Sequence, residues 1–470
     1  MEKENKSIGA ELKEKLFAKK ENGLKTVSAE ITEEAFAFCE GYKEFLNAAK
    51  TEREAVTVSI KMAEECGFKP YVYGEKHAAG DKLYINNRGK AAAFIVVGKD
   101  SIEKGATVSA AHIDSPRLDL KPNPLYEDTD MALLKTHYYG GIRKYQWTAI
   151  PLALHGVFAL KDGSVINVNI GEDENDPVFV VNDLLPHLAR EQSKRSLGDG
   201  IRGEELNILI GSMPFNDDKE SELVKLNVLN ILYEKYGVTE ADFLSAELEA
   251  VPAFKAKDLG LDRSMIGSYG HDDRVCAYPA IKAIFELEAP EKTAICVLAD
   301  KEEVGSDGNT GLKSEFLKHI IDDLSREAGS STTMALRNSC CLSADVNAAV
   351  DPTFKDVNES RNAAYLNYGV VITKYTGSGG KGGTSDASAE YMGKIRALLD
   401  KNNIVWQTGE LGKVDAGGGG TVAKYVANLG LDTVDLGVPV LSMHAPFETV
   451  SKLDVYMAYL ALVAFHSQSI

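Results

Sequence analysis

Several short apolar stretches of this sequence end in a side chain that can bind a metal ion. In chain order they are residues 106–111 before His112, 293–299 before Asp300, 340–344 before Asp345 and 438–443 before His444. Continuous apolar strands separated by helical stretches are typical of parallel sheets, whose functional sites lie beyond the carboxyl ends of the strands. We therefore expect these strand ends to meet at one edge of a sheet and to form a metal site.

The first of these strands continues into the motif His112-Ile113-Asp114. In an extended segment the His and the Asp lie on the same side, so His112 can bind a metal while Asp114 accepts the other ring N–H. The motif alone is weak evidence, because most segments of this kind are hydrogen-bonded loops. We predict that His112 is a metal ligand and that Asp114 supports it.

Two adjacent carboxylates, Asp272 and Asp273, precede an apolar helix. Such residues are often only helix N-caps. The alternative is that one carboxylate bridges two metal ions, with one oxygen bound to each. Asp272 is the candidate for the bridge and Asp273 its supporting neighbour, whereas we expect His271 to pack or to form a hydrogen bond.

The segment Asp300-Lys301-Glu302-Glu303 follows an unusually apolar stretch. Because adjacent side chains point in different directions, Glu303 can bind a metal while Glu302 acts as a general base on water. An exposed acidic loop is the alternative. However, charge at the end of a buried strand is hard to tolerate without a partner, which favours the metal site.

Together these residues predict a two-metal hydrolase site. Two imidazoles and three carboxylates suit zinc, and also cobalt or manganese. Such ions lower the pKa of water, and Glu302 would pass the released proton to the departing group. The predicted ligands are His112, Asp272, Glu303, Asp345 and His444.

The elements that must position these residues are predicted to form an α/β domain with an insertion. Helical spacing predicts a helix over residues 32–50, and Thr51 with Glu54 predicts a capping box at the start of a second helix. The region between His112 and Asp272 contains shorter strands and many turns. We predict a catalytic domain with a mostly parallel central sheet from residues 1–118 and 258–470, interrupted by a β-rich domain at 119–257.

The composition excludes some classes of partner. The 470 residues include 52 Lys and Arg against 70 Asp and Glu, a net charge of −18, which disfavours nucleic acid. The longest apolar run, residues 455–465, is about half of the roughly 20 residues that span a membrane. The polar N-terminus lacks the apolar stretch of a signal peptide, and the six cysteines show no C-x-x-C spacing. These features favour a reducing compartment, and we expect a cytoplasmic protein.

The sequence resembles the aspartyl-aminopeptidase family of two-metal aminopeptidases over nearly its whole length. The motifs that carry the resemblance are, in order, His112-Ile-Asp-Ser-Pro, Asp272-Asp-Arg, Asp300-Lys-Glu-Glu-Val-Gly-Ser, Ser343-Ala-Asp and Val434-Asp-Leu-Gly-Val-Pro-Val-Leu-Ser-Met-His444. The resemblance implies the same five ligands with Asp272 bridging, Glu302 as the general base and Asp114 supporting His112. It also implies a zinc-peptidase-type α/β fold interrupted by a β-rich domain for dimerisation or oligomerisation.

The resemblance further implies partners and substrate-binding residues. Members of the family assemble as tetrahedral dodecamers with active sites facing an interior chamber, so we expect a homo-oligomer. In similar enzymes the His that matches His187 reaches into a neighbouring subunit's site, and Lys374 resembles a substrate-side Lys of the family. The chain departs from the family pattern at Ala348, Asp351 and Lys413, in or near the expected substrate pocket. The preferred N-terminal residue of the substrate therefore stays open.

We predict a metalloaminopeptidase that removes one residue from the free N-terminus of short peptides. Two alternatives remain: a related metal-dependent deacylase or peptidase on the same site, and a non-catalytic oligomeric scaffold. Cleavage of an N-acetylated peptide would distinguish the first alternative from an aminopeptidase, because an aminopeptidase needs a free amine. The second is disfavoured because the chain retains every candidate ligand together with Glu302.

Overall fold

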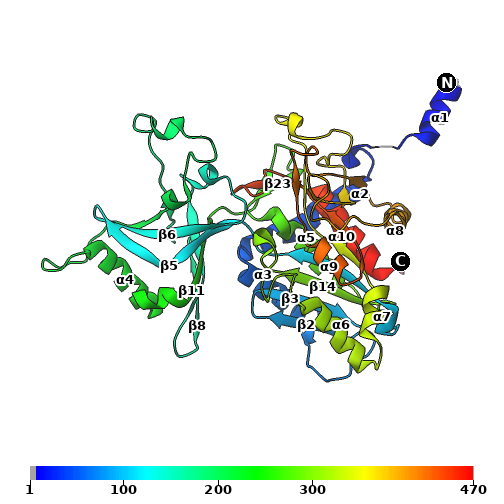
Figure 1. The fold of residues 1–470 in the computed structure, drawn as a ribbon, viewed down its shortest axis with the longest axis horizontal. Coiled ribbons are helices and arrows are strands. Elements are labelled where there is room, and N and C mark those ends of the chain that lie inside the picture. The colour runs from blue at the N-terminus through cyan, green and yellow to red at the C-terminus, as the bar shows by residue number, and fades with distance from the viewer. Residues whose placement is uncertain (1–6, 19, 469–470) are drawn as a thin grey trace.

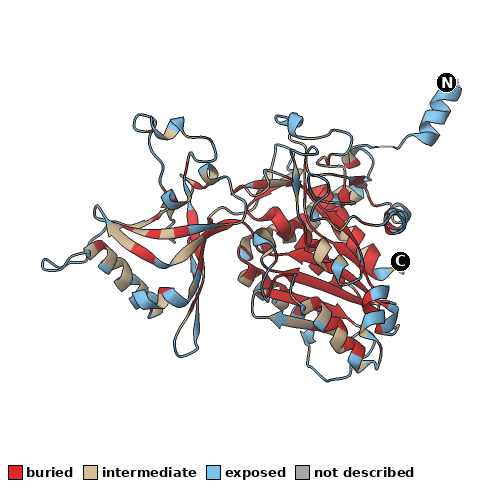
Figure 2. Ribbon diagram, in the orientation of Figure 1, coloured by how far each residue is buried: buried red, intermediate tan, exposed pale blue. Residues whose placement is uncertain are grey.

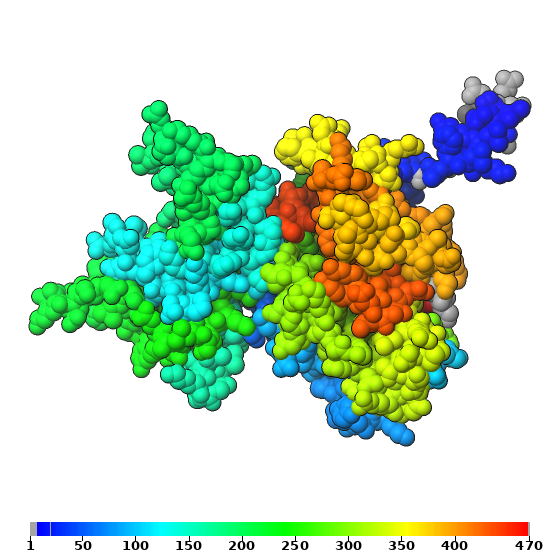
Figure 3. All heavy atoms as spheres, viewed as in Figure 1, coloured from blue at the N-terminus to red at the C-terminus, as the bar shows by residue number. Residues whose placement is uncertain are grey.

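The chain folds into two lobes, each built on its own β-sheet (Figure 1). The computed structural model describes residues 7–18 and 20–468, so the first six residues of the polar N-terminal segment lie outside the described part. The large lobe carries a nine-stranded sheet, and the inserted lobe, residues 117–252, carries a seven-stranded sheet. In the space-filling view the inserted lobe projects away from the large lobe (Figure 3).

The nine-stranded sheet has a parallel centre. Its strand order is β1-β2-β3-β14-β4-β15-β21-β17-β19, and the four neighbours β14, β4, β15 and β21 all run parallel. The predicted α/β class with a mostly parallel central sheet is thus confirmed. The strands are β1 (Lys69–Pro70), β2 (Lys82–Asn87), β3 (Ala91–Val96), β4 (Ala106–His112), β14 (Thr293–Ala299), β15 (Cys340–Ser343), β17 (Val370–Thr373), β19 (Trp406–Thr408) and β21 (Asp432–Gly437).

Helices cover both faces of this sheet because its central strands are apolar on both sides. In β3, Phe94 packs into the core on one face, and its neighbours Ala93 and Ile95 pack on the other, as the alternation of a strand requires. One face is covered by α2 (Ala29–Ala48), α3 (Glu52–Glu65), α5 (His271–Phe285), α8 (Ala389–Lys401) and α10 (Lys452–Ser467). The other is covered by α6 (Phe316–Glu327), α7 (Thr332–Asn338) and α9 (Ala423–Asn428). The predicted capping box at Thr51 and Glu54 begins α3.

The inserted lobe is a wholly antiparallel sheet with one helix, α4 (Leu223–Tyr236), packed on it. Its strands are β5 (Arg117–Asp128), β6 (Met131–Tyr139), β7 (Leu152–Ala159), β8 (Val165–Ile170), β9 (Val180–Val181), β10 (Ile208–Gly211) and β11 (Ala246–Pro252). Buried residues are concentrated in the large lobe, whereas α4 and the outer strands of the inserted lobe expose much of their surface (Figure 2). The exposed residues of the inserted lobe include the apolar side chains Val165, Val178, Ile231 and Tyr233.

A third, five-stranded sheet corrects one expectation. The apolar stretch before His444 is not a strand of the central sheet: β22 pairs with β16 and β23 in the small sheet, and β21 takes the central position instead. The chain leaves the central sheet at Gly437, two residues before Pro439, whose nitrogen cannot donate to a sheet. This sheet contains β12 (Lys257–Leu259), β13 (Met265–Ser268), β16 (Asn347–Ala348), β22 (Pro439–Leu441) and β23 (Glu448–Ser451).

The large lobe also carries two short strands and one outlying helix. β18 (Gly377–Ser378) pairs with β20 (Gly418–Gly419) in a two-stranded sheet, and α1 (Ile8–Leu16) projects from the large lobe without a buried residue. Among the helices of residues 7–18 and 20–468, none has the length and apolarity that crossing a bilayer requires.

Candidate metal centre

The candidate metal centre lies where adjacent elements of the large lobe end. His112 closes β4, Asp345 follows β15, and Glu302 and Glu303 lie in a short 3-10 turn after β14. Because β4 lies between β14 and β15 in the sheet, these strand ends are neighbours. Asp272 comes from the first turn of α5, so the sequence expectation that these groups converge is met by the fold.

Asp272 lies between the two predicted His ligands. One carboxylate oxygen, Oδ1, is 3.0 Å from His112 Nε2, and the other, Oδ2, is 3.1 Å from His444 Nε2. The Asp272 side chain is only 5% exposed, so solvent does not separate these groups. A carboxylate that offers one oxygen to each of two imidazoles is arranged as the predicted bridge requires.

Backbone carbonyls fix which nitrogen of each ring is available. His112 Nδ1 is 3.0 Å from the Asp114 carbonyl, and His444 Nδ1 is 2.9 Å from the Gly141 carbonyl. A carbonyl oxygen only accepts, so each ring carries its proton on Nδ1 and presents Nε2 to Asp272. In the neutral rings a lone pair then faces a carboxylate oxygen, an arrangement that a cation between them stabilises.

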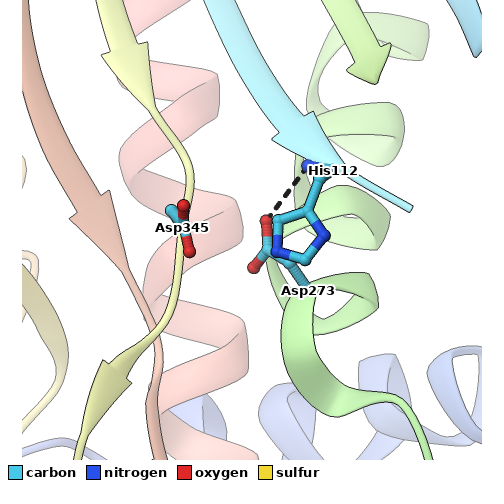
Figure 4. Close-up of side chains that lie close together, drawn as sticks. All are labelled: His112, Asp273 and Asp345. Carbon is cyan, nitrogen blue, oxygen red and sulfur yellow. Dashed lines mark hydrogen bonds between the residues drawn. The ribbon is translucent and has the colours of Figure 1, made fainter. Parts of the chain in front are cut away.

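Further carboxylates surround this pair. Glu303 Oε2 is 3.6 Å from His444 Nε2, and Glu302 Oε2 is 3.9 Å from His112 Nε2. Asp273 and Asp345 lie close to His112, and the three can each direct a ligand atom within 4.8 Å of the others (Figure 4). The structure thus brings all five predicted ligands together and adds Asp273 to them.

Buried oxygens without partners show that the cluster fits metal ions. Within the described residues, Asp273 Oδ1, Glu303 Oε1 and Asp345 Oδ2 are buried and accept no hydrogen bond. Burial, reinforced by the neighbouring negative charges, raises the pKa of Glu303 and of Asp345 well above the usual range. Divalent cations would satisfy these oxygens and remove the repulsion, so the donor set fits such ions.

Asp114 does more than support His112. Its Oδ1 accepts the backbone N–H of Glu302 at 3.1 Å, and its Oδ2 accepts the N–H of Glu303 at 3.2 Å and the Tyr139 hydroxyl at 2.8 Å. Its Oδ1 also lies 3.4 Å from His112 Nδ1. A single buried carboxylate therefore fixes the turn that carries both glutamates, a role that the H-x-D spacing did not reveal.

Glu448 is a second positioning group that sequence reasoning missed. Its Oε1 accepts the backbone N–H of His444 at 2.7 Å, and its Oε2 accepts that of Asp272 at 3.1 Å. The residue is 1% exposed, and burial raises the pKa of its carboxyl to about 8. Glu448 begins β23 of the small sheet, so its approach to α5 depends on tertiary pairing that no local motif indicates.

The inserted lobe closes the centre through the segment Tyr139–Gly141. A Cβ on Gly140 would lie 3.0 Å from Glu303 Oε2, and a Cβ on Gly141 would lie 3.2 Å from His444 Nδ1. Gly140 also has a φ of +75°, a conformation that favours glycine. Adjacent glycines after a strand were the available sequence signal for this close approach.

The candidate ligands line a cavity of about 430 Å³. Asp272, Glu302, Glu303, Asp345 and His444 all contribute to its wall, and the glycines 418–420 and the start of α9 form another part of it. This volume is in the range of sites for small molecules. The cavity can therefore admit the end of a peptide next to the carboxylates.

Three other His and Lys residues lie outside this centre. His187 is exposed in the loop between β9 and β10 of the inserted lobe. Lys374 does not line the cavity but forms an ion pair with Asp386 at 2.6 Å. His271 is buried, with Nδ1 2.7 Å from the Tyr42 hydroxyl and Nε2 3.2 Å from the Ile266 carbonyl, which is the hydrogen-bonding role expected for it.

Imidazoles and carboxylates gathered at the ends of parallel strands are typical of metal-dependent hydrolases built on an α/β sheet. Comparison with known proteins agrees: the model of a family described as "Aminopeptidase I zinc metalloprotease (M18)" matches residues 45–466. The chain belongs to this M18 family, which includes the aspartyl aminopeptidases, and it is a zinc metalloaminopeptidase. The resemblance recognised in the sequence is therefore confirmed.

Individual relatives cover almost the whole chain. A probable M18 family aminopeptidase 1 of Clostridium acetobutylicum is 52% identical over 431 residues, which are 90% of this chain and 93% of the relative. The crystal structure of an M18 family aminopeptidase from Thermotoga maritima is 44% identical with a TM-score of 0.92, covering 96% of this chain and 100% of that one. The structure of the S. cerevisiae mApe1 dodecamer is 20% identical with a TM-score of 0.74, and the match covers 93% of this chain and 97% of that one. This likeness shows that the two chains share a fold.

Proposed function

We propose that the protein removes the N-terminal residue of peptides with two divalent metal ions, most simply zinc, although cobalt or manganese would use the same donor types. Asp272 would bridge the ions. The observation that carries this proposal is the placement of Asp272 Oδ1 and Oδ2 at 3.0 and 3.1 Å from the Nε2 atoms of His112 and His444. The ions would be held by His112, Asp272, Glu303, Asp345 and His444.

Glu302 is proposed as the general base. When bound, the ions would polarise the scissile carbonyl and lower the pKa of a water. Glu302 lines the cavity and its side chain is 19% exposed. It lies in one potential metal-binding group, with His112 and Glu303, whereas Glu303 lies in two. The Glu302 carboxylate would take a proton from water and return it to the leaving amine, while Asp114 holds its backbone in place.

The pKa of Glu302 suits proton transfer. Burial raises it to about 7, against the opposing effect of His112. A base whose pKa lies near the working pH is both able to accept a proton and able to release it. Nearby cations would lower this pKa, which would keep the carboxylate available at neutral pH.

Glu302→Gln tests this role. We expect kcat to fall about 100-fold or more because the amide cannot accept the proton, while the zinc content, measured by mass spectrometry of the metals, stays close to that of the wild type. Glu390→Gln, an exposed position on α8, serves as the control with unchanged kcat. Full activity of the Glu302 variant would eliminate it as the base.

We further propose a homo-oligomer assembled through the inserted lobe, with a tetrahedral dodecamer as the expected form. Support comes from exposed apolar side chains of this lobe, including Met213, Ile231 and Tyr233, and from the dodecamer of mApe1, which shares the fold. In this assembly the exposed His187 would reach the site of a neighbouring subunit, and Lys374 would lie on the substrate side. All six cysteines are free thiols, which fits the cytoplasm.

A further inference from the structure

Buried charges also gather where the inserted lobe meets the large lobe. Arg117, the first residue of β5, is 4% exposed. Its guanidinium nitrogens lie 3.2 Å from Glu52 Oε2, 3.3 Å from Glu249 Oε1 and 2.8 Å from Asp119 Oδ1. Glu52 begins α3 of the large lobe, whereas Glu249 belongs to β11 of the inserted lobe. One guanidinium therefore joins the two lobes.

Lys90 extends this group of charges toward the metal centre. It lies in the turn between β2 and β3, and its side chain is 14% exposed. Its Nζ is 3.2 Å from Glu52 Oε1 and 4.0 Å from Asp300 Oδ2, so a single ammonium faces two buried carboxylates. Asp300 follows β14 directly and lies two residues before Glu302. The charges thus reach the start of the turn that carries the two glutamates of the centre.

Arg117 reaches the same turn by a second route. Its guanidinium carbon lies 3.9 Å from the centroid of the Tyr139 ring, a cation–π distance. The Tyr139 hydroxyl donates to Asp114, which accepts the backbone N–H groups of Glu302 and Glu303. The turn is therefore supported through its backbone N–H groups on this route and through the end of β14 on the other.

Lys90 keeps the charges on the second route in balance. Burial opposes the ionisation of Glu52, but Arg117 and Lys90 lower the pKa of this residue to about 2, so it stays a carboxylate. Burial and the charge of Glu52 raise the pKa of Asp300. Lys301 also pairs with Asp300, at 3.3 Å, but its side chain is 31% exposed, so solvent screens this pair more strongly. Lys90 is the cation that faces both carboxylates.

We propose that Lys90 is a positioning residue for Glu302. Its ammonium attracts Glu52 and Asp300, and by holding Asp300 it fixes the end of β14 from which the turn starts. Without it, the two carboxylates would repel each other in a region of low dielectric, and a shift of Asp300 would relieve that repulsion. This inference rests on the proposed function and goes beyond it, because Lys90 does not line the cavity that holds the candidate ligands.

Lys90→Met tests this role, because it removes the charge and keeps most of the apolar stem. Lys82→Met is the matched control. Lys82 belongs to β2 of the same hairpin, its side chain is 15% exposed, and its Nζ pairs with Glu288 at 3.2 Å. The zinc-loaded variants and wild type are compared by kcat, KM and zinc content with a free-amine peptide. Lys90→Arg tests whether restoring the charge restores the rate.

We expect Lys90→Met to lower kcat about tenfold with little change in KM or zinc content, since Glu302 is displaced while zinc stays bound. Lys90→Arg should recover most of this loss, and Lys82→Met should match the wild type. If Lys90→Met does not fold, the double variant Glu52→Gln/Lys90→Met, which removes both charges of the pair, takes its place with the same expectation. Unchanged kcat, equal losses in the two Met variants, or no recovery by Lys90→Arg overturns the inference.

Hydrogen–deuterium exchange distinguishes failure of this inference from failure of the proposed function, because it needs no turnover. The backbone N–H groups of Glu302 and Glu303 are bonded to Asp114, so displacement of the turn should speed their exchange. We expect faster exchange of residues 300–305 in Lys90→Met than in wild type or Lys82→Met, with α10 unchanged. Unchanged exchange at 300–305, or an equal increase in α10, contradicts the inference. A zinc-loaded wild type that cleaves no peptide contradicts only the proposed function.

Discussion

At the scale of single residues, the centre is organised by carboxylates that accept from the backbone. Asp114 fixes the N–H groups of Glu302 and Glu303, and Glu448 fixes those of His444 and Asp272. Neither carboxylate is a predicted ligand, but each holds the backbone of residues predicted to bind a metal ion or, in the case of Glu302, to act as the general base. Removing such a supporting group commonly lowers metal affinity or activity by about 10- to 100-fold.

The buried acids also predict how the stability of the metal-free protein depends on pH. Burial raises the pKa of Glu302 to about 7 and that of Glu448 to about 8, above the usual value of either group. The folded state therefore holds protons that the unfolded state has released, so the free energy of unfolding falls as the pH rises from about 4.5 to about 8. Calorimetry should give metal-free protein a higher Tm at about pH 5.5 than at about pH 8.

Zinc provides the control for this prediction. Cations compensate the carboxylates, so the increase in Tm on adding zinc should be larger at about pH 8 than at about pH 5.5. If the metal-free protein is more stable at the higher pH, burial and mutual repulsion do not raise the pKa values of these carboxylates as the prediction requires.

At the scale of elements, strand ends of the central sheet could be predicted, and tertiary pairings could not. The apolar stretches before His112, Asp300 and Asp345 form β4, β14 and β15, because buried parallel strands have a continuous apolar signal. The equally apolar stretch before His444 belongs to another sheet. Its composition is the same whichever strand it pairs with, so the sequence indicated His444 as a candidate ligand but not the sheet to which the preceding strand belongs.

The contact of Tyr139–Gly141 with the centre is another tertiary pairing that the sequence did not reveal, and a substitution at Tyr139 tests its importance. Tyr139 ends β6 of the inserted lobe and donates to Asp114 at 2.8 Å, with the Arg117 guanidinium 3.9 Å from its ring centroid. Tyr139→Phe removes only the hydroxyl. We expect kcat to fall about tenfold with little change in KM, because the turn that carries Glu302 loses part of its support.

Tyr138→Phe is the matched control, since this neighbour is 39% exposed and the hydroxyl that donates to Asp114 is that of Tyr139. Steady-state kinetics and metal content are measured on both variants. Equal effects of the two substitutions would mean that the inserted lobe does not act on the turn through Tyr139.

At the scale of the whole molecule, the inserted lobe combines two tasks. It contributes Tyr139 and Gly141 to the centre on one side and presents apolar side chains to its surroundings on another. Its β-rich character could be predicted from short strands and turns. Its contact with the centre could not, because that contact joins residues far apart in the sequence and no local motif indicates it. Assembly and catalysis are therefore expected to be linked through this lobe.

Ile231→Glu on α4 tests the assembly. Ile231 is 54% exposed, and burying a charge at an apolar interface is costly, so light scattering should show a smaller assembly than wild type. Leu261→Glu, at a fully exposed position of the large lobe, should leave the assembly intact. An unchanged mass for Ile231→Glu would place the interface elsewhere.

The most direct measurement is hydrolysis of matched free-amine and N-acetylated peptides by metal-stripped enzyme and by the same enzyme refilled with zinc, cobalt or manganese. A two-metal aminopeptidase should cleave only the free-amine peptides, only after refilling, with activity rising to a plateau at two ions per chain. Cleavage of the acetylated peptides would indicate a deacylase or another peptidase. No cleavage with any of the ions would contradict the account and leave a non-catalytic scaffold.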